Sequence, residues 1–227
     1  MQHFNTARFL SPTSPPLLAN DDIHVWLLVL DPALKPREVT TAAHSLLKKL
    51  LMRYADLDRA PEIARSERGK PYAPTLAGID FNLSHARDHV LIAIARAQPL
   101  GIDLERIDRE IRIEDLARRY FSSTEAEALE TLPAELRLPA FLRLWTSKEA
   151  VLKALGAGIS FGLEKVSFAL DAVGNPTGLL DIAPEAGPRE KWQIASLEPA
   201  PGFLGAIAWH GPPRRIRTFR ADPTPDG

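Results

Sequence analysis

The sequence predicts an α+β fold that is built mainly from antiparallel sheet. Short apolar runs alternate with segments of helical periodicity, and the last runs follow one another at hairpin-like spacing. The order strand, helix, strand, strand occurs once before residue 100 and once again after it. We therefore expect two similar lobes, an N-terminal one over residues 1–100 and a C-terminal one over residues 101–227 with a proline-rich tail.

The elements follow from the spacing of apolar residues. An apolar run at residues 23–30 predicts a buried strand, and apolar positions over residues 39–54 recur at helical spacing. Further strands are predicted at residues 79–83, 90–95, 101–105, 166–170, 192–197 and 203–210. Further helices are predicted at residues 113–121, 124–132 and 136–155. Either Ser123 or Thr124 should begin the second of these helices, with Glu127 completing a capping box.

Composition excludes several classes of protein. The chain has 227 residues, 45% of them hydrophobic, and a net charge of −1, which excludes wholesale disorder and disfavours generic nucleic-acid binding. No apolar segment is long enough to span a membrane, and residues 1–20 lack a signal-peptide pattern and should form an irregular arm. The absence of cysteine removes disulfides and thiol nucleophiles and fits a reducing compartment. We expect a cytoplasmic monomer.

Two acidic side chains lie on one face of the predicted strand at residues 101–105. Because side chains alternate along a strand, Asp103 and Glu105 share a face, about 7 Å apart at the backbone. Two such carboxylates can converge on one hard cation, and Gly101 permits close approach of another chain or a ligand. The alternative is a half-exposed strand with two solvated acids.

The helix predicted at residues 136–155 carries an unusual lysine. Lys148 falls inside its apolar stripe, where an ammonium group needs a partner. Glu149 and Lys153 lie at the edge of that stripe, four residues apart. One acid between two lysines beside an apolar face is typical of a metal and phosphate site. The alternative for the edge pair is an ordinary salt bridge worth about 0.3–0.5 kcal/mol.

Two shorter motifs precede these. The strand that contains Phe81 ends at the polar pair Ser84 and His85, which is either part of a site or an ordinary hydrogen-bonded strand end. Lys70 lies between Gly69 and a proline, in a stiff loop that suits a phosphate clamp. The alternative for Lys70 is an exposed lysine without a ligand.

In order, the motifs GKP, FNLSH, GIDLE and WTSKEAVLK resemble those of the Sfp-type 4'-phosphopantetheinyl transferases. These enzymes move the phosphopantetheine arm of coenzyme A onto carrier proteins. The resemblance covers residues 65–170 well and the rest of the chain loosely. It implies a pseudo-dimer of two similar α+β lobes, with coenzyme A and the active site in the cleft between them.

The resemblance also implies roles for individual residues. Mg²⁺ would be held by Asp103, Glu105 and Glu149. Glu149, or a water that it holds, would take the proton from the carrier serine, and Lys153 would stabilise the leaving phosphate. The phosphates of coenzyme A would be contacted by Lys70, Ser84, His85, Lys148 and Lys153. The carrier would dock on residues 113–129, with an apolar surface formed by Leu116, Tyr120 and Phe121. The alternative for Tyr120 and Phe121 is a place in the core.

The chain departs from the family pattern before residue 39. It is short there and keeps only Lys35 and Arg37, and residues 42–45 (AAHS) lie where an arginine is often found, so the contacts to the adenosine 3'-phosphate are open. We expect apo acyl or peptidyl carrier proteins and coenzyme A as partners, and neither nucleic acid nor a membrane. Two other classes stay open: a binding module that has lost catalysis, which would not need Glu149, and a Mg²⁺-dependent phosphoesterase, which would need no protein acceptor.

Overall fold

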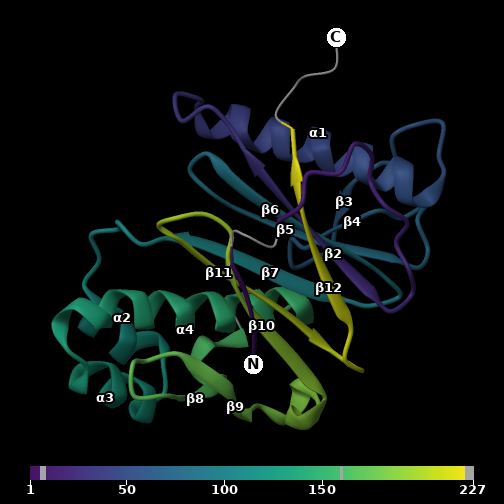
Figure 1. The fold of residues 1–227 in the computed structure, drawn as a ribbon. Coiled ribbons are helices and arrows are strands. Elements are labelled where there is room, and N and C mark those ends of the chain that lie inside the picture. The colour runs from purple at the N-terminus through teal and green to yellow at the C-terminus, as the bar shows by residue number, and fades with distance from the viewer. Residues whose placement is uncertain (6–8, 159–160, 223–227) are drawn as a thin grey trace.

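The computed structural model describes residues 1–5, 9–158 and 161–222 (Figure 1). Its strands form two four-stranded sheets and two short hairpins. The first sheet has the order β12 (Arg215–Ala221), β2 (Asp22–Val29), β6 (His89–Arg96) and β5 (Ile79–Ala86). The second sheet has the order β1 (Gln2–Asn5), β10 (Trp192–Glu198), β11 (Phe203–His210) and β7 (Leu100–Arg106). The expected α+β class is confirmed.

Helices flank the two sheets. The α-helices are α1 (Pro36–Ala55), α2 (Ile113–Tyr120), α3 (Ser123–Thr131) and α4 (Ala134–Leu155). The hairpins pair β3 (Ala64–Arg65) with β4 (Pro71–Tyr72) and β8 (Val166–Leu170) with β9 (Pro176–Ile182). Short 3₁₀ turns occur at Leu163–Lys165, Pro184–Ala186 and Arg189–Lys191. Helix α1 covers the first sheet, and α4 packs on the second sheet with α2 and α3 beside it (Figure 1).

The fold has four layers: α1, the first sheet, the second sheet, and α4 with its neighbours. The side chains of each strand alternate between the layers on its two sides. On β2, Ile23 and Val25 point into the core between the sheets, whereas Trp26 packs under α1. On β7, Ile102 and Leu104 point into the same inter-sheet core. The acidic residues of β7 therefore point to the other face of the strand, toward α4, as the alternation predicts.

The strand order of the two sheets repeats. Strands β2, β6 and β5 lie in the same relative order as β7, β11 and β10, and a long helix follows the first strand of each set. The outer strands differ, because β12 pairs in parallel with β2 whereas β1 pairs in parallel with β10. Each end of the chain thus adds an edge strand to the sheet formed by the other half. The pseudo-dimer and the boundary at residue 100 stay predictions.

All predicted helices and strands are present, with ends that differ by up to a few residues. Four strands or hairpins were not predicted: β1 in the proline-containing arm, the β3–β4 hairpin, β9 and the arginine-rich β12. Helix α3 is capped by Ser122, one residue before the earlier of the two predicted caps, and its capping box is completed by Glu125 and not by Glu127: the Ser122 amide donates to the Glu125 carboxylate at 2.9 Å. The proline-rich tail at residues 223–227 lies outside the described residues. No described helix is long and apolar enough to cross a membrane.

Helix α4 crosses β7 at Gly101, and only a glycine fits at this crossing. A Cβ atom at this position would collide with the carbonyl oxygen of Ala150 and the backbone nitrogen of Ala154. Both obstacles are helix backbone, which cannot turn aside as a flexible side chain can. The missing side chain therefore sets how closely α4 approaches β7.

We expect Gly101→Ala to lower the free energy of unfolding by about 1–3 kcal/mol or more, because α4 must move away from β7. Urea denaturation monitored by circular dichroism measures this change. Gly178→Ala is the matched control, since Gly178 also lies in a strand but has no atom within 4 Å of the added Cβ. Equal stabilities of the two variants would show that the crossing at Gly101 is not tight.

Candidate active site

A hydrogen-bonded cluster joins β5, β7 and α4. The Lys153 ammonium on α4 donates to Asp103 Oδ1 at 2.7 Å and to Ser84 Oγ at 3.1 Å. Ser84 on β5 donates in turn to the same Asp103 oxygen at 2.9 Å. The Asp103 side chain is buried, whereas Lys153 is partly exposed. Three of the sequence-predicted site residues are thus brought into direct contact.

Two further acids, Glu149 and Glu105, lie close to Asp103. Burial raises the pKa of Glu149 to about 7; the charges of Asp103 and Glu105 add to the rise, and Lys153 opposes it. Burial also raises the pKa of Glu105, and a bond from Arg109 opposes this rise. We call Asp103, Glu105 and Glu149 the carboxylate cluster. Its members repel one another when ionised, and the two cations beside them, Lys153 and Arg109, do not neutralise three charges.

The carboxylate cluster leaves oxygen atoms without partners. Among the described residues, Asp103 Oδ2 and Glu149 Oε1 are buried and accept no hydrogen bond. Unpaired buried carboxylate oxygens are costly, and they are the donors that hard divalent cations prefer. Within the described chain, no three acidic or histidine side chains are already gathered as a metal site. The donor set nevertheless fits a cation between Asp103 and Glu149.

Lys148 does not join this cluster. Its side chain is fully buried, and its ammonium group donates to Glu125 at 2.6 Å and to the Leu163 carbonyl oxygen at 3.1 Å. Glu125 also accepts from the backbone of Ser122 and of Phe168. Glu125 is therefore the partner that the buried ammonium group of Lys148 needs. This pair ties α4 to the start of α3 and to β8, away from β5 and β7.

Lys70 reaches the same region as the cluster but binds backbone. Its ammonium donates to the carbonyl oxygens of Leu100 and Ala154, each at 3.1 Å. These atoms lie at the start of β7 and at the end of α4. Burial lowers the pKa of Lys70, and the charge of Asp80 opposes this effect. Lys70 thus links the loop before β4 to the two elements that carry the carboxylate cluster.

His85 is exposed at the end of β5 and lies in a group of cations. Burial lowers the pKa of His44 on α1, and three neighbouring cations lower it further: Arg65, Lys48 and His85. We call these four residues the basic cluster. The sequence singles out the stretch at residues 42–45 that contains His44, but it does not place His44, Lys48 or Arg65 beside His85.

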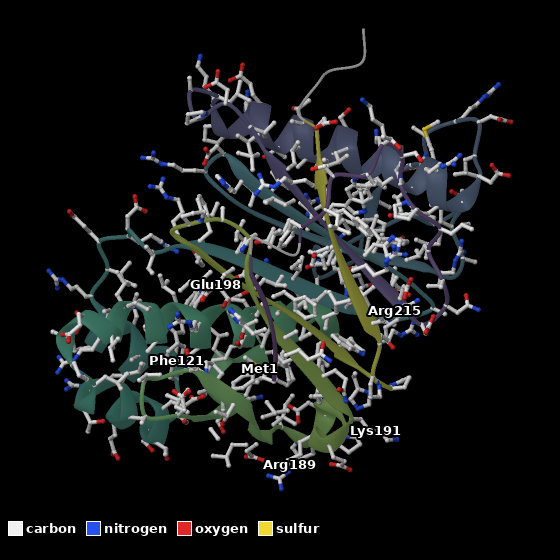
Figure 2. All side chains as sticks on the ribbon, in the orientation of Figure 1. Met1, Phe121, Arg189, Lys191, Glu198 and Arg215 are labelled. Atoms are coloured by element: carbon white, nitrogen blue, oxygen red, sulfur yellow. The ribbon has the colours of Figure 1, made fainter. Side chains whose placement is uncertain are left out.

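The residues expected to receive a carrier protein differ in exposure. Phe121 is only 4% exposed and stacks on Phe141, with 5.0 Å between ring centroids, so it belongs to the core. Figure 2 places it in the helical part of the molecule, where α2, α3 and α4 meet. Tyr120 and Leu116 are half-buried, and the Tyr120 ring meets Trp145 edge-on.

Comparison with known proteins points to one family. Residues 99–198, which include the carboxylate cluster and Lys153, match the sequence profile of the 4'-phosphopantetheinyl transferase superfamily. The chain is 31% identical to the 4'-phosphopantetheinyl transferase HetI of Nostoc sp. over 88% of this chain and 93% of that protein. It is 34% identical to the 4'-phosphopantetheinyl transferase Sfp of Bacillus subtilis over 71% of this chain and 69% of that protein.

A third relative covers less of the chain. The 4'-phosphopantetheinyl transferase AcpT of Salmonella typhimurium is 36% identical over 44% of this chain and 52% of that protein. The resemblance stated from the motifs is thereby confirmed, because the similarity to HetI extends over most of both chains. The chain belongs to the 4'-phosphopantetheinyl transferases, a family of enzymes that transfer the phosphopantetheine group.

Proposed function

We propose that this enzyme transfers the 4'-phosphopantetheine group of coenzyme A to a serine of an apo acyl or peptidyl carrier protein, with Mg²⁺ bound at the site. The observation that carries the proposal is the pair of buried, unpartnered oxygens on Asp103 and Glu149, beside the Lys153 ammonium. Oxygen donors and a positive side chain together suit a phosphate ester and a hard cation. The site lies in the part of the chain that matches the family profile.

Asp103, Glu105 and Glu149 would hold the cation. When bound, Mg²⁺ would neutralise charge on the pyrophosphate of coenzyme A. Lys153 adds a positive charge that Asp103 and Ser84 hold in place. Lys153 would stabilise the charge that the leaving phosphate gains. Stabilising such charge is the main task of a catalyst in phosphoryl transfer.

Glu149, or a water that it holds, accepts the proton of the carrier serine. The serine oxygen forms a bond to the phosphorus that carries the pantetheine. The bond from that phosphorus to the bridging oxygen breaks, and 3',5'-ADP leaves. The pKa of Glu149 is raised to about 7 by burial and by its acidic neighbours, and a cation at the carboxylate cluster would lower it, so Glu149 would be ionised and able to accept a proton near neutral pH.

The basic cluster is the candidate site for the 3'-phosphate of coenzyme A. His44 and Lys48 come from α1, Arg65 from β3 and His85 from β5, and Lys48 and Arg65 bring positive charge to the region that the four residues share. They would replace the basic segment that this chain lacks before residue 39. Lys70 and Lys148 are weaker candidates, because their ammonium groups already bind backbone oxygens and Glu125.

The carrier protein would dock on α2 and α3, with the half-buried Leu116 and Tyr120 as its apolar contacts. Phe121 is excluded from that surface by its burial. A cytoplasmic, monomeric, two-lobed enzyme stays part of the proposal. Which carrier protein is modified is decided by experiment.

Intact mass spectrometry of a panel of apo carrier proteins tests the reaction class. After incubation with coenzyme A, Mg²⁺ and this enzyme, we expect one carrier or more to gain the mass of one phosphopantetheine group, and excess chelator to abolish the gain. Release of phosphate or AMP without any modified carrier would favour a phosphoesterase. Binding of coenzyme A with neither product would favour a module without catalysis.

Glu149→Gln tests the proton acceptor, because it keeps the size of the side chain and removes its basicity. We expect kcat to fall on the order of 10²-fold or more, and coenzyme binding measured by calorimetry to weaken much less. The control is Glu190→Gln, at an exposed position outside the site. This variant should keep the wild-type kcat and the wild-type coenzyme binding. Near-normal turnover of Glu149→Gln would show that Glu149 is not the proton acceptor.

The basic cluster is tested with a pair of substrates that differ by one phosphate. We expect His44→Ala and Arg65→Ala to raise the KM for coenzyme A about tenfold, since each removes a hydrogen bond to the charged phosphate that is worth about 1.4 kcal/mol. The KM for 3'-dephospho-coenzyme A should change little. Arg53→Ala, on the side of α1 that lines a different groove, is the control. Equal losses with both substrates would place the 3'-phosphate elsewhere.

A further inference from the structure

The edge of β7 that faces β5 is satisfied by side chains instead of by a strand. Backbone pairing in the described chain ends at β7 in one sheet and at β5 in the other, although the two strands are neighbours. The Leu100 carbonyl oxygen accepts from Lys70, and the Ile102 carbonyl oxygen accepts from Lys153. The Ile102 amide donates to the side-chain oxygen of Asn82 at 2.9 Å. These three bonds replace a backbone ladder.

Asn82 occupies a particular place in this arrangement. It lies on β5 two residues before Ser84, so both side chains point to the same side of the strand, toward β7. Both are buried, Asn82 with 4% of its surface exposed. Asn82 holds the backbone one residue before Asp103, and Ser84 holds the Asp103 carboxylate itself. The position of Asp103 relative to β5 is therefore fixed at two adjacent points.

This geometry decides which Asp103 oxygen is occupied. Oδ1 receives both the Ser84 hydroxyl and the Lys153 ammonium, whereas Oδ2 receives nothing. Between two strands without a backbone ladder, only side chains resist sliding of one strand along the other. If β7 slid along β5, Ser84 would no longer meet Oδ1 and the carboxylate would turn.

We propose that Asn82 is a positioning residue: its amide oxygen fixes β7 against β5 so that Asp103 keeps Oδ1 on Ser84 and Lys153 and leaves Oδ2 free for the cation. The inference rests on the proposed function, because it assigns Oδ2 to a metal. Partners that orient a metal ligand without touching the metal typically change metal affinity or activity by about 10–100-fold when they are replaced.

The chain contains a matched control in Gln98. This side chain is also an amide, is also 4% exposed, and also binds backbone, donating to the carbonyl oxygens of Pro99 and His210 at 3.1 Å. It lies just before β7, at the end away from Asp103. A purely structural role for Asn82 would give Asn82→Leu and Gln98→Leu the same phenotype.

The test compares the Mg²⁺ dependence of wild type, Asn82→Leu and Gln98→Leu. For each protein, thermal unfolding in the presence of coenzyme A and carrier modification are measured over a range of Mg²⁺ concentrations. We expect Asn82→Leu to need about tenfold more Mg²⁺ for half of each effect, with an unchanged KM for the carrier. Gln98→Leu should unfold at a lower temperature but keep the wild-type Mg²⁺ dependence.

A wild-type Mg²⁺ dependence in Asn82→Leu would overturn the inference and leave the proposed function intact. If neither the unfolding temperature nor carrier modification of the wild type changes with Mg²⁺ concentration, the metal assignment and the inference are both overturned. Should Asn82→Leu not fold, Asn82→Ser replaces it. Serine is smaller than asparagine, so a water can enter and accept the hydrogen bond from the Ile102 amide. The same tenfold shift is expected in Asn82→Ser, and its absence is equally decisive.

Discussion

The contact between β5 and β7 is held by side chains, and the whole site depends on it. Two sheets meet at strands that do not pair, and the backbone atoms left free at Leu100 and Ile102 bind side chains from β5, from α4 and from the loop before β4. Because buried backbone groups must be paired, these side chains cannot leave without a cost. Gly101 lets α4 pack directly against the face of β7. Lys153 and Glu149 thereby reach Asp103.

Helix α4 carries two lysines whose surroundings differ in one respect. Lys148 and Glu125 form a fully buried pair in which both carboxylate oxygens and the ammonium have partners. Lys153 and Asp103 form a pair in which one carboxylate oxygen has none among the described residues. A completed pair fixes packing, whereas an incomplete pair close to Glu149, an acid whose pKa is raised, stores repulsion that a ligand can relieve. The difference separates the structural lysine from the proposed site.

Sequence reasoning predicted the parts of this site that depend on local periodicity. Alternation along β7 placed Asp103 and Glu105 on the face opposite Ile102, and helical spacing showed that Lys148 needed a partner. The identity of that partner, Glu125, depends on how α3 packs on α4, and so does the start of α3 at Ser122. Strands β1 and β12 were missed because their pairing is with distant strands. The backbone bonds of Lys70 are likewise a product of tertiary structure.

The central claim is that the oxygens left without partners on Asp103 and Glu149 hold a divalent cation. Crystals grown with Mn²⁺ and coenzyme A test it directly, because Mn²⁺ gives an anomalous scattering signal that Mg²⁺ does not. The account predicts a single strong anomalous peak bound by Asp103 Oδ2 and Glu149 Oε1, with Ser84 still on Asp103 Oδ1. An anomalous peak elsewhere, with these two oxygens bonded only to protein groups, would contradict it.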